Sequence, residues 1–474
     1  MLLRGFFDEQ LAQRSYLVAC DRTRLGLVVD PNRDIARYID AAAHEGIQIA
    51  AVAETHIHAD FVSGARDLAR EVSAPLHVSS LGGNDWQYKS LDDGAELLRD
   101  GSSFAVGEVR IDVMHTPGHT PEHVTFLVTD TASATAPIGA LTGDFIFVGD
   151  VGRPDLLERA AGAAGTKEAA ARALFRSLEK FKQLPDYLQL WPGHGAGSAC
   201  GKALGSMPSS TLGYEKLFNW GLIESREDGF VRRVLTGQPD PPAYFAVMKQ
   251  INRDGPPPMA DIPPPDISVR ELASELSRGA LVIDTRLGPE FAKKHAASSI
   301  NIPYTKSFLA YSGSILPYDR DLYLIAGDDN ADSIIDDLAL IGIDRIGGVY
   351  SCRSIDDLAA AGIAMDSTSQ LATDTLKDRL SRNGQVVLDV RGNDEWDHGH
   401  IPGAIHIPLG TLQSRLDEIP RNGEIAVHCQ GGTRSSIAAS ILQKNGIAVS
   451  NVTGGFREWE KSGGQIERDS QARP

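Results

Sequence analysis

Cysteine is scarce in this sequence, with four residues in 474, all far apart and none in a C-x-x-C pair. So few cysteines in a chain of this size exclude a disulfide framework. Long apolar runs are missing too, since no segment approaches the roughly 20 residues of a membrane-spanning helix. The apolar segment at residues 1–7 is too short for a secretory signal. We therefore expect a cytoplasmic protein without membrane contacts, in which any reactive cysteine works as a thiolate.

Positive charge is also in deficit. Lys and Arg number 46 against 63 Asp and Glu, which leaves a formal net charge of −17. This balance argues against nucleic acid and anionic membranes as partners. The hydrophobic share of 42% and the charged share of 23% are those of an ordinary globular protein. The length predicts roughly two to four domains.

Proline is concentrated in one segment, residues 255–266, which holds six of the 25 prolines. Such a segment favours extended polyproline geometry and predicts a stiff linker. It separates a first domain, residues 1–254, from a C-terminal region that contains an internal repeat. Asp284 and Asp389 lie in similar apolar runs, 389 − 284 = 105 positions apart. Short β-branched runs alternate with helical patterns in both copies, which predicts α/β domains with parallel sheets at residues 267–366 and 367–474.

A cluster of ligand-type side chains follows the apolar run at residues 47–52. His56, His58 and Asp60 lie within five positions, and imidazole with carboxylate on one tight loop is a metal-ligand set. Three later loops also place such residues where an apolar run ends, namely His119, Asp144 and His194. Loops at one edge of a rigid sheet converge, so the set predicts a metal site. His115 and His123 flank the second loop, and we expect them in the core or at the surface without a role in the site.

These motifs resemble the metallo-β-lactamase superfamily over roughly residues 1–250. The motifs are H-x-H-x-D at 56–60, P-G-H-T at 117–120, T-G-D at 142–144 and P-G-H-G at 192–195. The resemblance implies a four-layer αββα sandwich with a metal at one edge of its two sheets. Residues 149–156 look like the corresponding stretch of the glyoxalase II and persulfide dioxygenase branch.

The resemblance also implies which residues hold the metal. Two-metal members of the superfamily have a third histidine in the first motif, where this chain has Phe61, which makes a dinuclear zinc hydrolase less favoured. Persulfide dioxygenases hold one iron through the equivalents of His56, His119 and Asp144. Two histidines and one carboxylate leave open positions, as Fe(II) oxygen chemistry requires. We expect one Fe(II) per chain, with zinc as the alternative.

The remaining side chains of the predicted site need another role. His58, Asp60 and His194 are expected to orient ligands and to hydrogen-bond water or substrate. Cys200 follows His194 by six positions in a glycine-rich stretch. A free buried cysteine is more often inert packing. The alternative is a functional thiol that carries or contacts a persulfide.

A second reactive centre is predicted near the C-terminus. Cys429 follows the apolar run at residues 425–428 and precedes Gly431, Gly432, Arg434 and a helix expected from about residue 435. Backbone N–H groups at a helix start favour a thiolate, and a guanidinium suits an oxyanion. This C-x-x-G-x-R loop resembles the rhodanese sulfurtransferases. Cysteine phosphatases, the competing class, have one more residue between cysteine and arginine.

The first copy of the repeat lacks these groups. Alignment places Ala326 opposite Cys429, since 429 − 326 = 103, and Ala331 opposite Arg434. Neither nucleophile nor guanidinium remains, so we expect residues 267–366 to be structural or to serve in docking.

The domain order resembles the bacterial multidomain persulfide dioxygenase–sulfurtransferases. It implies oxidation of a low-molecular-weight persulfide by O2 to sulfite, coupled to sulfane-sulfur transfer that gives or uses thiosulfate. The alternatives are a zinc glyoxalase II-like thioester hydrolase with an appended sulfurtransferase, and a sulfur-carrier scaffold with a structural metal. The thiol that carries the persulfide stays open. We also expect a homo-oligomer, either a dimer or a tetramer.

Overall fold

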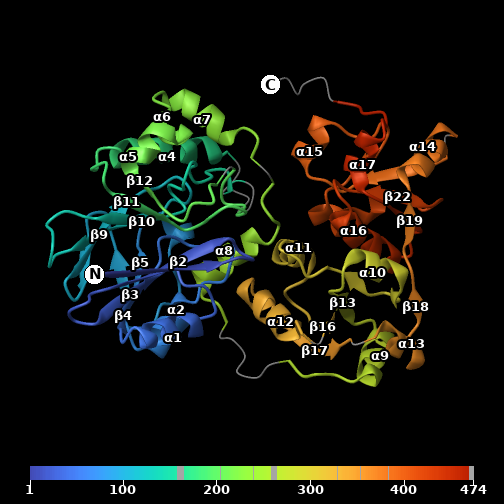
Figure 1. Ribbon diagram of the computed structural model, residues 1–474, viewed down its shortest axis with the longest axis horizontal. Coiled ribbons are helices and arrows are strands. Elements are labelled where there is room, and N and C mark those ends of the chain that lie inside the picture. The colour runs from blue at the N-terminus through green and yellow to red at the C-terminus, as the bar shows by residue number, and fades with distance from the viewer. Residues whose placement is uncertain are drawn as a thin grey trace. The chain divides into compact units, whose positions relative to one another are not determined.

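The computed structural model describes residues 1–156, 158, 165–202, 204–238, 240–257, 264–327, 329–352, 354–382 and 384–468 (Figure 1). The chain divides into two compact units, Met1–Met259 with Ala339–Gly342 and Ala260–Leu338 with Ile343–Pro474. Of the predicted linker at 255–266, residues 258–263 lie outside the described residues, and the domain ranges stay predictions. None of the described helices combines the length and apolar character that a membrane crossing requires.

In its described part, the first unit contains two six-stranded sheets. The first sheet has the order β1 (Leu2–Asp8), β2 (Gln13–Ala19), β3 (Leu25–Val29), β4 (Gln48–Ala53), β5 (Leu76–Ser79) and β6 (Glu96–Leu98). The second has the order β12 (Ser210–Thr211), β11 (Gln189–Pro192), β10 (Gly139–Gly143), β9 (Val124–Asp130), β8 (Val109–His115) and β7 (Ser103–Val106). Both sheets are mixed, with β3 to β6 parallel in the first and β10 and β11 parallel in the second.

The two sheets pack face to face, and helices cover their outer faces. Val18 and Leu27 of the first sheet share a core with Val109 and Phe126 of the second. Among the described residues, the helices of this unit are α1 (Ala36–His44), α2 (Ala65–Glu71), η1 (Asn84–Trp86), α4 (Lys167–Phe181), α5 (Leu212–Phe218), α6 (Trp220–Ile223), α7 (Glu227–Leu235) and α8 (Phe245–Asp254). Helices α1 and α2 pack on the first sheet, and α4 and α7 pack on the second (Figure 1).

Helix α4 illustrates why the layers form. Its buried residues Ala171, Leu174, Leu178 and Phe181 recur every three or four positions, which gives one apolar stripe along the helix. That stripe packs against the second sheet, while charged residues occupy the opposite face. The result is the helix–sheet–sheet–helix order expected of an αββα sandwich.

In its described part, the second unit contains two wholly parallel sheets, and four strands of each follow the same order. The first is β15 (Ile300–Asn301), β13 (Leu281–Asp284), β16 (Leu322–Ala326) and β17 (Ile346–Ser351). The other is β21 (Ile405–His406), β20 (Val386–Asp389), β22 (Ile425–His428), β23 (Val449–Val452) and β19 (Ser369–Leu371). A short pair, β14 (His295–Ala296) with β18 (Met365–Asp366), accompanies the first sheet.

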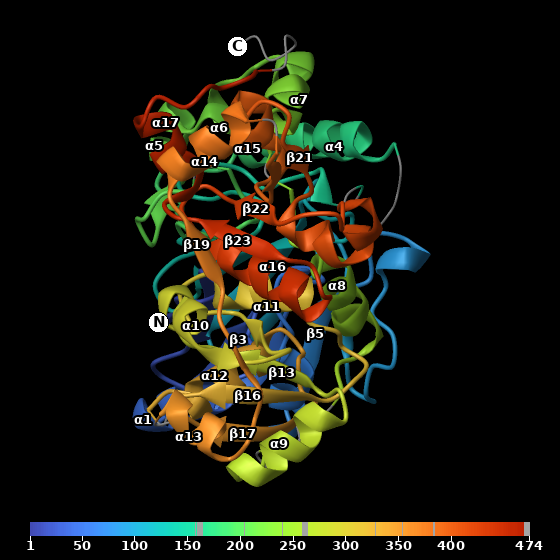
Figure 2. The same ribbon diagram turned by 90° about the vertical axis from the view of Figure 1, so that its right-hand side faces the viewer.

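Helices flank both sheets. They are α9 (Val269–Ser277), α10 (Gly288–Lys293), α11 (Phe308–Ile315), α12 (Ala331–Leu340), α13 (Ile355–Ala360), α14 (Thr373–Ser381), α15 (Asn393–His398), η2 (Leu409–Glu418), α16 (Thr433–Lys444) and α17 (Gly455–Lys461). Figure 2 shows α16 beside β22 and β23. Eight consecutive residues of α16, Ser435 to Leu442, are buried, so this helix is enclosed along most of its length.

The strand registers repeat the offset expected from the sequence. Asp284 pairs with Ile325 in the first sheet, and Asp389 pairs with His428 in the second. Ala326 and Cys429 therefore occupy equivalent positions, one residue beyond Ile325 and His428. Arg286 and Arg391 each form an ion pair with the aspartate two residues earlier, with closest contacts of 2.6 Å. The two halves of this unit are thus built on one plan.

Candidate metal centre and cysteine loop

The candidate ligands of the first unit meet where strands of the two sheets end. His56 and His58 follow β4, His119 follows β8, Asp144 follows β10 and His194 follows β11. With Asp60, these side chains are at most 5% exposed. The structure therefore brings all six residues named from the sequence into one buried cluster.

Three of them form a group that can hold a cation. The ligand atoms of His56, His119 and Asp144 lie within 4.8 Å of one another. Asp144 Oδ2 is 3.5 Å from His119 Nε2 and 4.0 Å from His56 Nε2. Among the described residues, neither oxygen of this buried carboxylate has a hydrogen-bond partner. A buried carboxylate that accepts no hydrogen bond is costly, so this donor set fits a metal ion.

Hydrogen bonds behind the two imidazoles orient them. His119 Nδ1 donates to the carbonyl of Arg153 at 3.2 Å, which leaves Nε2 free to ligate. His56 Nδ1 lies 3.0 Å from Thr55 Oγ1, and that hydroxyl donates to Asp30. Burial lowers the pKa of both His56 and His119, which keeps the neutral, metal-binding form.

His58 is directed toward a different partner. Its Nε2 lies 3.2 Å from Asp30 Oδ1. Burial works to lower the pKa of His58, but the Asp30 carboxylate outweighs it and raises that pKa to about 9. Phe61 is fully buried, with its ring 4.5 Å from that of His58. Asn252 donates to the carbonyls of His58 and Phe61, which holds the loop.

A second group of ligand-type atoms adjoins the first. One ligand atom each of Asp60, His194 and Cys200 lies within 4.8 Å of the others. His194 Nε2 is 3.1 Å from Asp60 Oδ2 and 3.5 Å from Asp144 Oδ1. Burial works to lower the pKa of His194, but the two carboxylates raise it well above its usual value. Burial raises the pKa of the Cys200 thiol to about 12.

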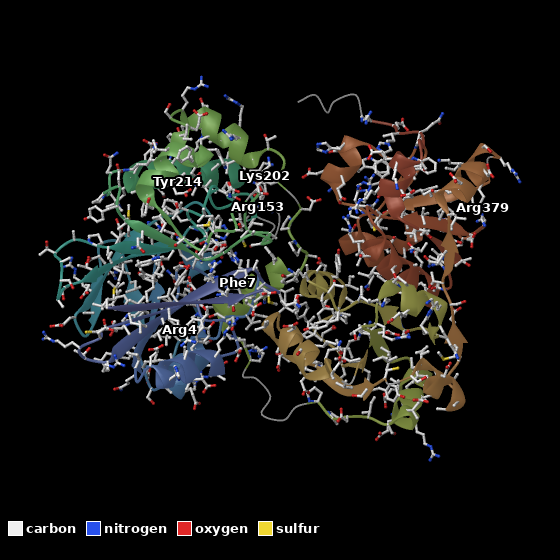
Figure 3. All side chains as sticks on the ribbon, in the orientation of Figure 1. Arg4, Phe7, Arg153, Lys202, Tyr214 and Arg379 are labelled. Atoms are coloured by element: carbon white, nitrogen blue, oxygen red, sulfur yellow. The ribbon has the colours of Figure 1, made fainter. Side chains whose placement is uncertain are left out.

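An internal arginine anchors the segment that carries Cys200. Arg153 is fully buried and donates to Asp155 at 3.0 and 2.7 Å. Its Nη1 also donates to the carbonyl of Ala199 at 3.0 Å. Further along, the Lys202 amide donates to Asp150 at 2.9 Å (Arg153 and Lys202 are labelled in Figure 3). The residues on both sides of Cys200 are thereby tied to the loop that follows Asp144.

The sequence reasoning missed His123. We expected it in the core or at the surface without a role, and it is indeed buried, but against the site. Its Nε2 accepts the backbone N–H of Asp144 at 3.1 Å, and its ring stacks on His56 at 5.0 Å. Glu122 was also missed, and it accepts the Ile57 amide at 2.8 Å. No local pattern marks either contact, because each joins loops more than 20 residues apart.

In the cysteine loop of the second unit, hydrogen-bond donors surround the sulfur of Cys429. Cys429 is 2% exposed, and its Sγ accepts the Gly432 amide at 3.0 Å and the Ser435 hydroxyl at 3.5 Å. Gly432 has a φ of 116°, which side chains disfavour, and α16 begins at the next residue. These groups stabilise negative charge on sulfur.

Arg434 has a carboxylate partner that the sequence analysis did not identify, and its expected role toward an oxyanion stays a prediction. Its guanidinium is paired with the Glu395 carboxylate through contacts of 2.5 and 2.8 Å. The positive charge beside Cys429 is therefore largely compensated. An adjacent cleft of about 330 Å³ is lined by uncharged groups, which include Gly431, Gly432 and Thr433. A ligand in this cleft therefore contacts backbone and hydroxyl groups and no charged side chain of the lining.

Comparison with known proteins identifies both regions. The model of the Metallo-beta-lactamase superfamily matches residues 10–194. A crystal structure of a metallo-beta-lactamase from Staphylococcus aureus is 40% identical, with a TM-score of 0.67, over 74% of this chain and 98% of that chain. This chain belongs to the metallo-beta-lactamase superfamily. The Rhodanese-like domain model matches residues 372–462. The molecule therefore joins a metallo-beta-lactamase domain to a C-terminal rhodanese-like domain, and membership of residues 267–366 in the rhodanese family stays a prediction.

Curated relatives of the superfamily domain span several activities. A "Beta-lactamase hydrolase-like protein" from Xylella fastidiosa is 28% identical over 260 residues, which is 48% of this chain and 54% of that protein. The "Persulfide dioxygenase ETHE1, mitochondrial" of Bos taurus is 26% identical over 199 residues, 41% of this chain and 68% of that protein. The chain spans about half the length of the first curated relatives it matches, 51% and 54%.

Proposed function

We propose that this protein oxidises a low-molecular-weight persulfide with O2 to sulfite at one Fe(II), and that Cys429 transfers sulfane sulfur, giving or using thiosulfate. The observation that carries the proposal is the group of His56, His119 and Asp144. Two imidazoles and one carboxylate on one side of an ion leave positions open for substrate and O2. The rhodanese-like domain of the same chain supports sulfur chemistry as the common theme.

His56, His119 and Asp144 would hold the iron, which when bound supplies the activation of O2. The balanced reaction is RSSH + O2 + H2O → RSH + SO3²⁻ + 2 H⁺, in which the outer sulfur is oxidised and O2 is reduced. The protein's own part is positioning. Thr55 and Arg153 fix the two imidazoles, and burial keeps bulk water away from the cluster.

At the other centre, the Cys429 thiolate attacks the sulfane sulfur of thiosulfate. A sulfur–sulfur bond forms to Cys429, and the bond to sulfite breaks with its electron pair leaving on sulfite. In reverse, sulfite takes the sulfur from the Cys429 persulfide and releases thiosulfate. Gly432 and Ser435 donate hydrogen bonds to the sulfur and stabilise its negative charge. When both steps run, a second persulfide molecule loads Cys429, giving up its outer sulfur and leaving as the thiol RSH. Sulfite made at the iron then takes that sulfur from the Cys429 persulfide, so thiosulfate is the product.

The first repeat has a different role in this proposal. Ala326 occupies the position of Cys429, and Ala331 that of Arg434, so residues 267–366 transfer no sulfur and serve as structure or in docking. We further propose a cytoplasmic homo-oligomer, a dimer or a tetramer, with no nucleic-acid or membrane partner. Light scattering on the eluted full-length protein tests the oligomer, and a single-chain mass would overturn it.

The decisive experiment measures metal content and activity together. Protein produced without added metal should contain one iron per chain and should consume O2 only when a persulfide is present. Glutathione, coenzyme A and bacillithiol persulfides, compared at equal concentration, identify the carrier. Zinc at the His56–His119–Asp144 group together with thioester hydrolysis would overturn the proposal in favour of a glyoxalase II-like hydrolase. Bound metal without either activity would favour a sulfur-carrier scaffold.

A further inference from the structure

Large apolar side chains are exposed together on the first unit, around helices α5 and α6. We name this surface the α5 face, and it consists of Tyr187, Tyr214, Leu217, Phe218 and Ile223, which are 54% to 68% exposed. They are half of the ten large apolar side chains that are exposed in the described part of the chain. Single exposed apolar residues are ordinary, whereas a contiguous group marks an interaction surface.

Helix α5 is apolar on two sides. Its inner side carries the buried Leu212 and Glu215, and the Glu215 carboxylate accepts a backbone amide of the loop after β10 at 2.8 Å. Its outer side carries Tyr214, Leu217 and Phe218, at the i, i+3 and i+4 spacing of one helix face. The rings of Tyr214 and Phe218 lie 4.7 Å apart (Tyr214 is labelled in Figure 3). Because the inner side is anchored, the helix cannot rotate to bury the outer side.

The segments beside α5 extend the same surface. Tyr187 lies next to Asp186, whose carbonyl accepts the Gly213 amide at 2.9 Å and whose carboxylate is 2.5 Å from Lys216 Nζ. Helix α6, which carries Ile223 at its end, follows α5 and packs against it. The five apolar side chains therefore come from three neighbouring segments of the first unit.

The charges at the border of the α5 face are paired. Lys216 is bound to Asp186, and Arg226 Nε lies 3.9 Å from Glu224 Oε1. The whole chain has a formal net charge of −17, so two copies repel each other over most of their surface. A surface whose border charges compensate one another is where a second copy can approach without that repulsion.

We propose that the α5 face is the surface on which a second copy of this chain packs, in a two-fold interface where both copies use the same residues. An aromatic side chain buries about 150–250 Å², so five side chains of about that size, each more than half exposed, offer roughly 600 Å² per copy. With a polar rim, this area approaches the roughly 800 Å² per partner of a stable interface. The inference rests on the homo-oligomer of the proposed function, to which it adds a surface.

The test compares full-length wild-type protein with Leu217→Glu. The control is Leu97→Glu on β6, since Leu97 is 59% exposed and lies outside the α5 face. Light scattering measures the mass, and far-ultraviolet circular dichroism checks the fold. We expect Leu217→Glu to halve the mass of the wild-type oligomer, because a two-fold interface would bury two new carboxylates against apolar side chains. Leu97→Glu should keep the full mass.

Hydrogen exchange on wild-type protein tests the surface without any substitution. Residues 212–223 should exchange more slowly in concentrated than in dilute protein, because association protects them. Exchange that does not depend on concentration would overturn the proposal, since the face is then open or covered within one chain.

The remaining outcomes separate the surface from the proposed function. A folded Leu217→Glu variant with the full oligomer mass would overturn the surface and leave the oligomer standing. A single-chain mass of the wild type would overturn both. The persulfide dioxygenase fails on a different measurement, when iron-loaded wild-type protein shows no persulfide-dependent O2 uptake.

Discussion

The candidate metal-ligand group of the first unit and the cysteine loop of the second both lie where buried strands end. They present opposite hydrogen-bonding groups, acceptors in the first and donors in the second. Around Asp144 there are lone pairs in excess, from imidazoles and carboxylates, and within the described residues its two oxygens have no hydrogen-bond partner. Around Cys429 there are donors in excess, the Gly432 amide and the Ser435 hydroxyl, pointing at one sulfur. Burial is nearly equal, at 1% for Asp144 and 2% for Cys429.

The comparison shows that burial does not by itself decide what a site binds. Lone pairs without donors attract a cation, and converging N–H groups stabilise an anion. The two chemistries should therefore respond to different substitutions, and each of the following experiments changes one side of the comparison.

The largest effect is expected from Cys429→Ser. Serine keeps the hydrogen bonds but removes the thiolate nucleophile, so sulfur transfer from thiosulfate should fall by more than about 10³-fold. Persulfide-dependent O2 uptake should stay within a factor of about two, because the metal cluster is untouched. Formation of thiocyanate from thiosulfate and cyanide measures sulfur transfer, and an oxygen electrode measures O2 uptake. Cys352→Ser, at a half-buried cysteine outside the loop, is the control, and loss of both activities in Cys429→Ser would disprove their separation.

His119→Ala reverses the pattern. Residues that hydrogen-bond to metal ligands contribute roughly 10- to 100-fold to metal affinity, and removing a ligand itself should cost more. We therefore expect the variant to lose iron and its O2 uptake to fall by at least about 100-fold. Sulfur transfer by Cys429 should be unchanged. Iron quantification with both assays measures this outcome. His44→Ala, at an exposed histidine, is the control. A folded variant that keeps its iron would show that His119 is not a ligand.

His123→Phe tests whether the ligand group depends on the orientation of the Asp144 carboxylate. Phenylalanine can keep the stacking on His56, but it cannot accept the Asp144 amide. We expect about 10- to 100-fold weaker iron binding with a nearly normal thermal midpoint. Competition with a metal chelator measures the affinity, and His77→Phe, at a buried histidine that stacks on Phe104, is the matched control. Equal affinities in the two variants would remove His123 from the site.

The smallest effect is expected from Glu395→Gln, which leaves the Arg434 charge uncompensated. Partly exposed ion pairs are worth up to about 1 kcal/mol, so the KM for thiosulfate should fall by up to about fivefold. The change should shrink at high salt, since screening weakens it. Steady-state kinetics at two ionic strengths measure it, with Glu458→Gln on α17 as control. A higher KM would mean that Glu395 orients Arg434 for substrate instead of masking it.

The positions of the ligand residues were predictable, because strand ends and turn residues are local features. The apolar run at residues 425–428 forms strand β22 with those bounds, and the helix expected from about residue 435 begins at 433. The grouping of His56, His119 and Asp144 came from the family resemblance, because strand ends do not say which loop residues meet. Each follows an apolar run that had to be a buried strand.

The sequence alone determined the strands, the loops at their ends and the types of side chain that those loops carry. Which of these side chains meet was decided by the tertiary structure. Cys200 joins Asp60 and His194, His123 supports Asp144, and Glu395 neutralises Arg434. The physical reason is that hydrogen bonds and charge pairs act over a few ångströms in space. Only the folded backbone sets those distances between segments far apart in the chain.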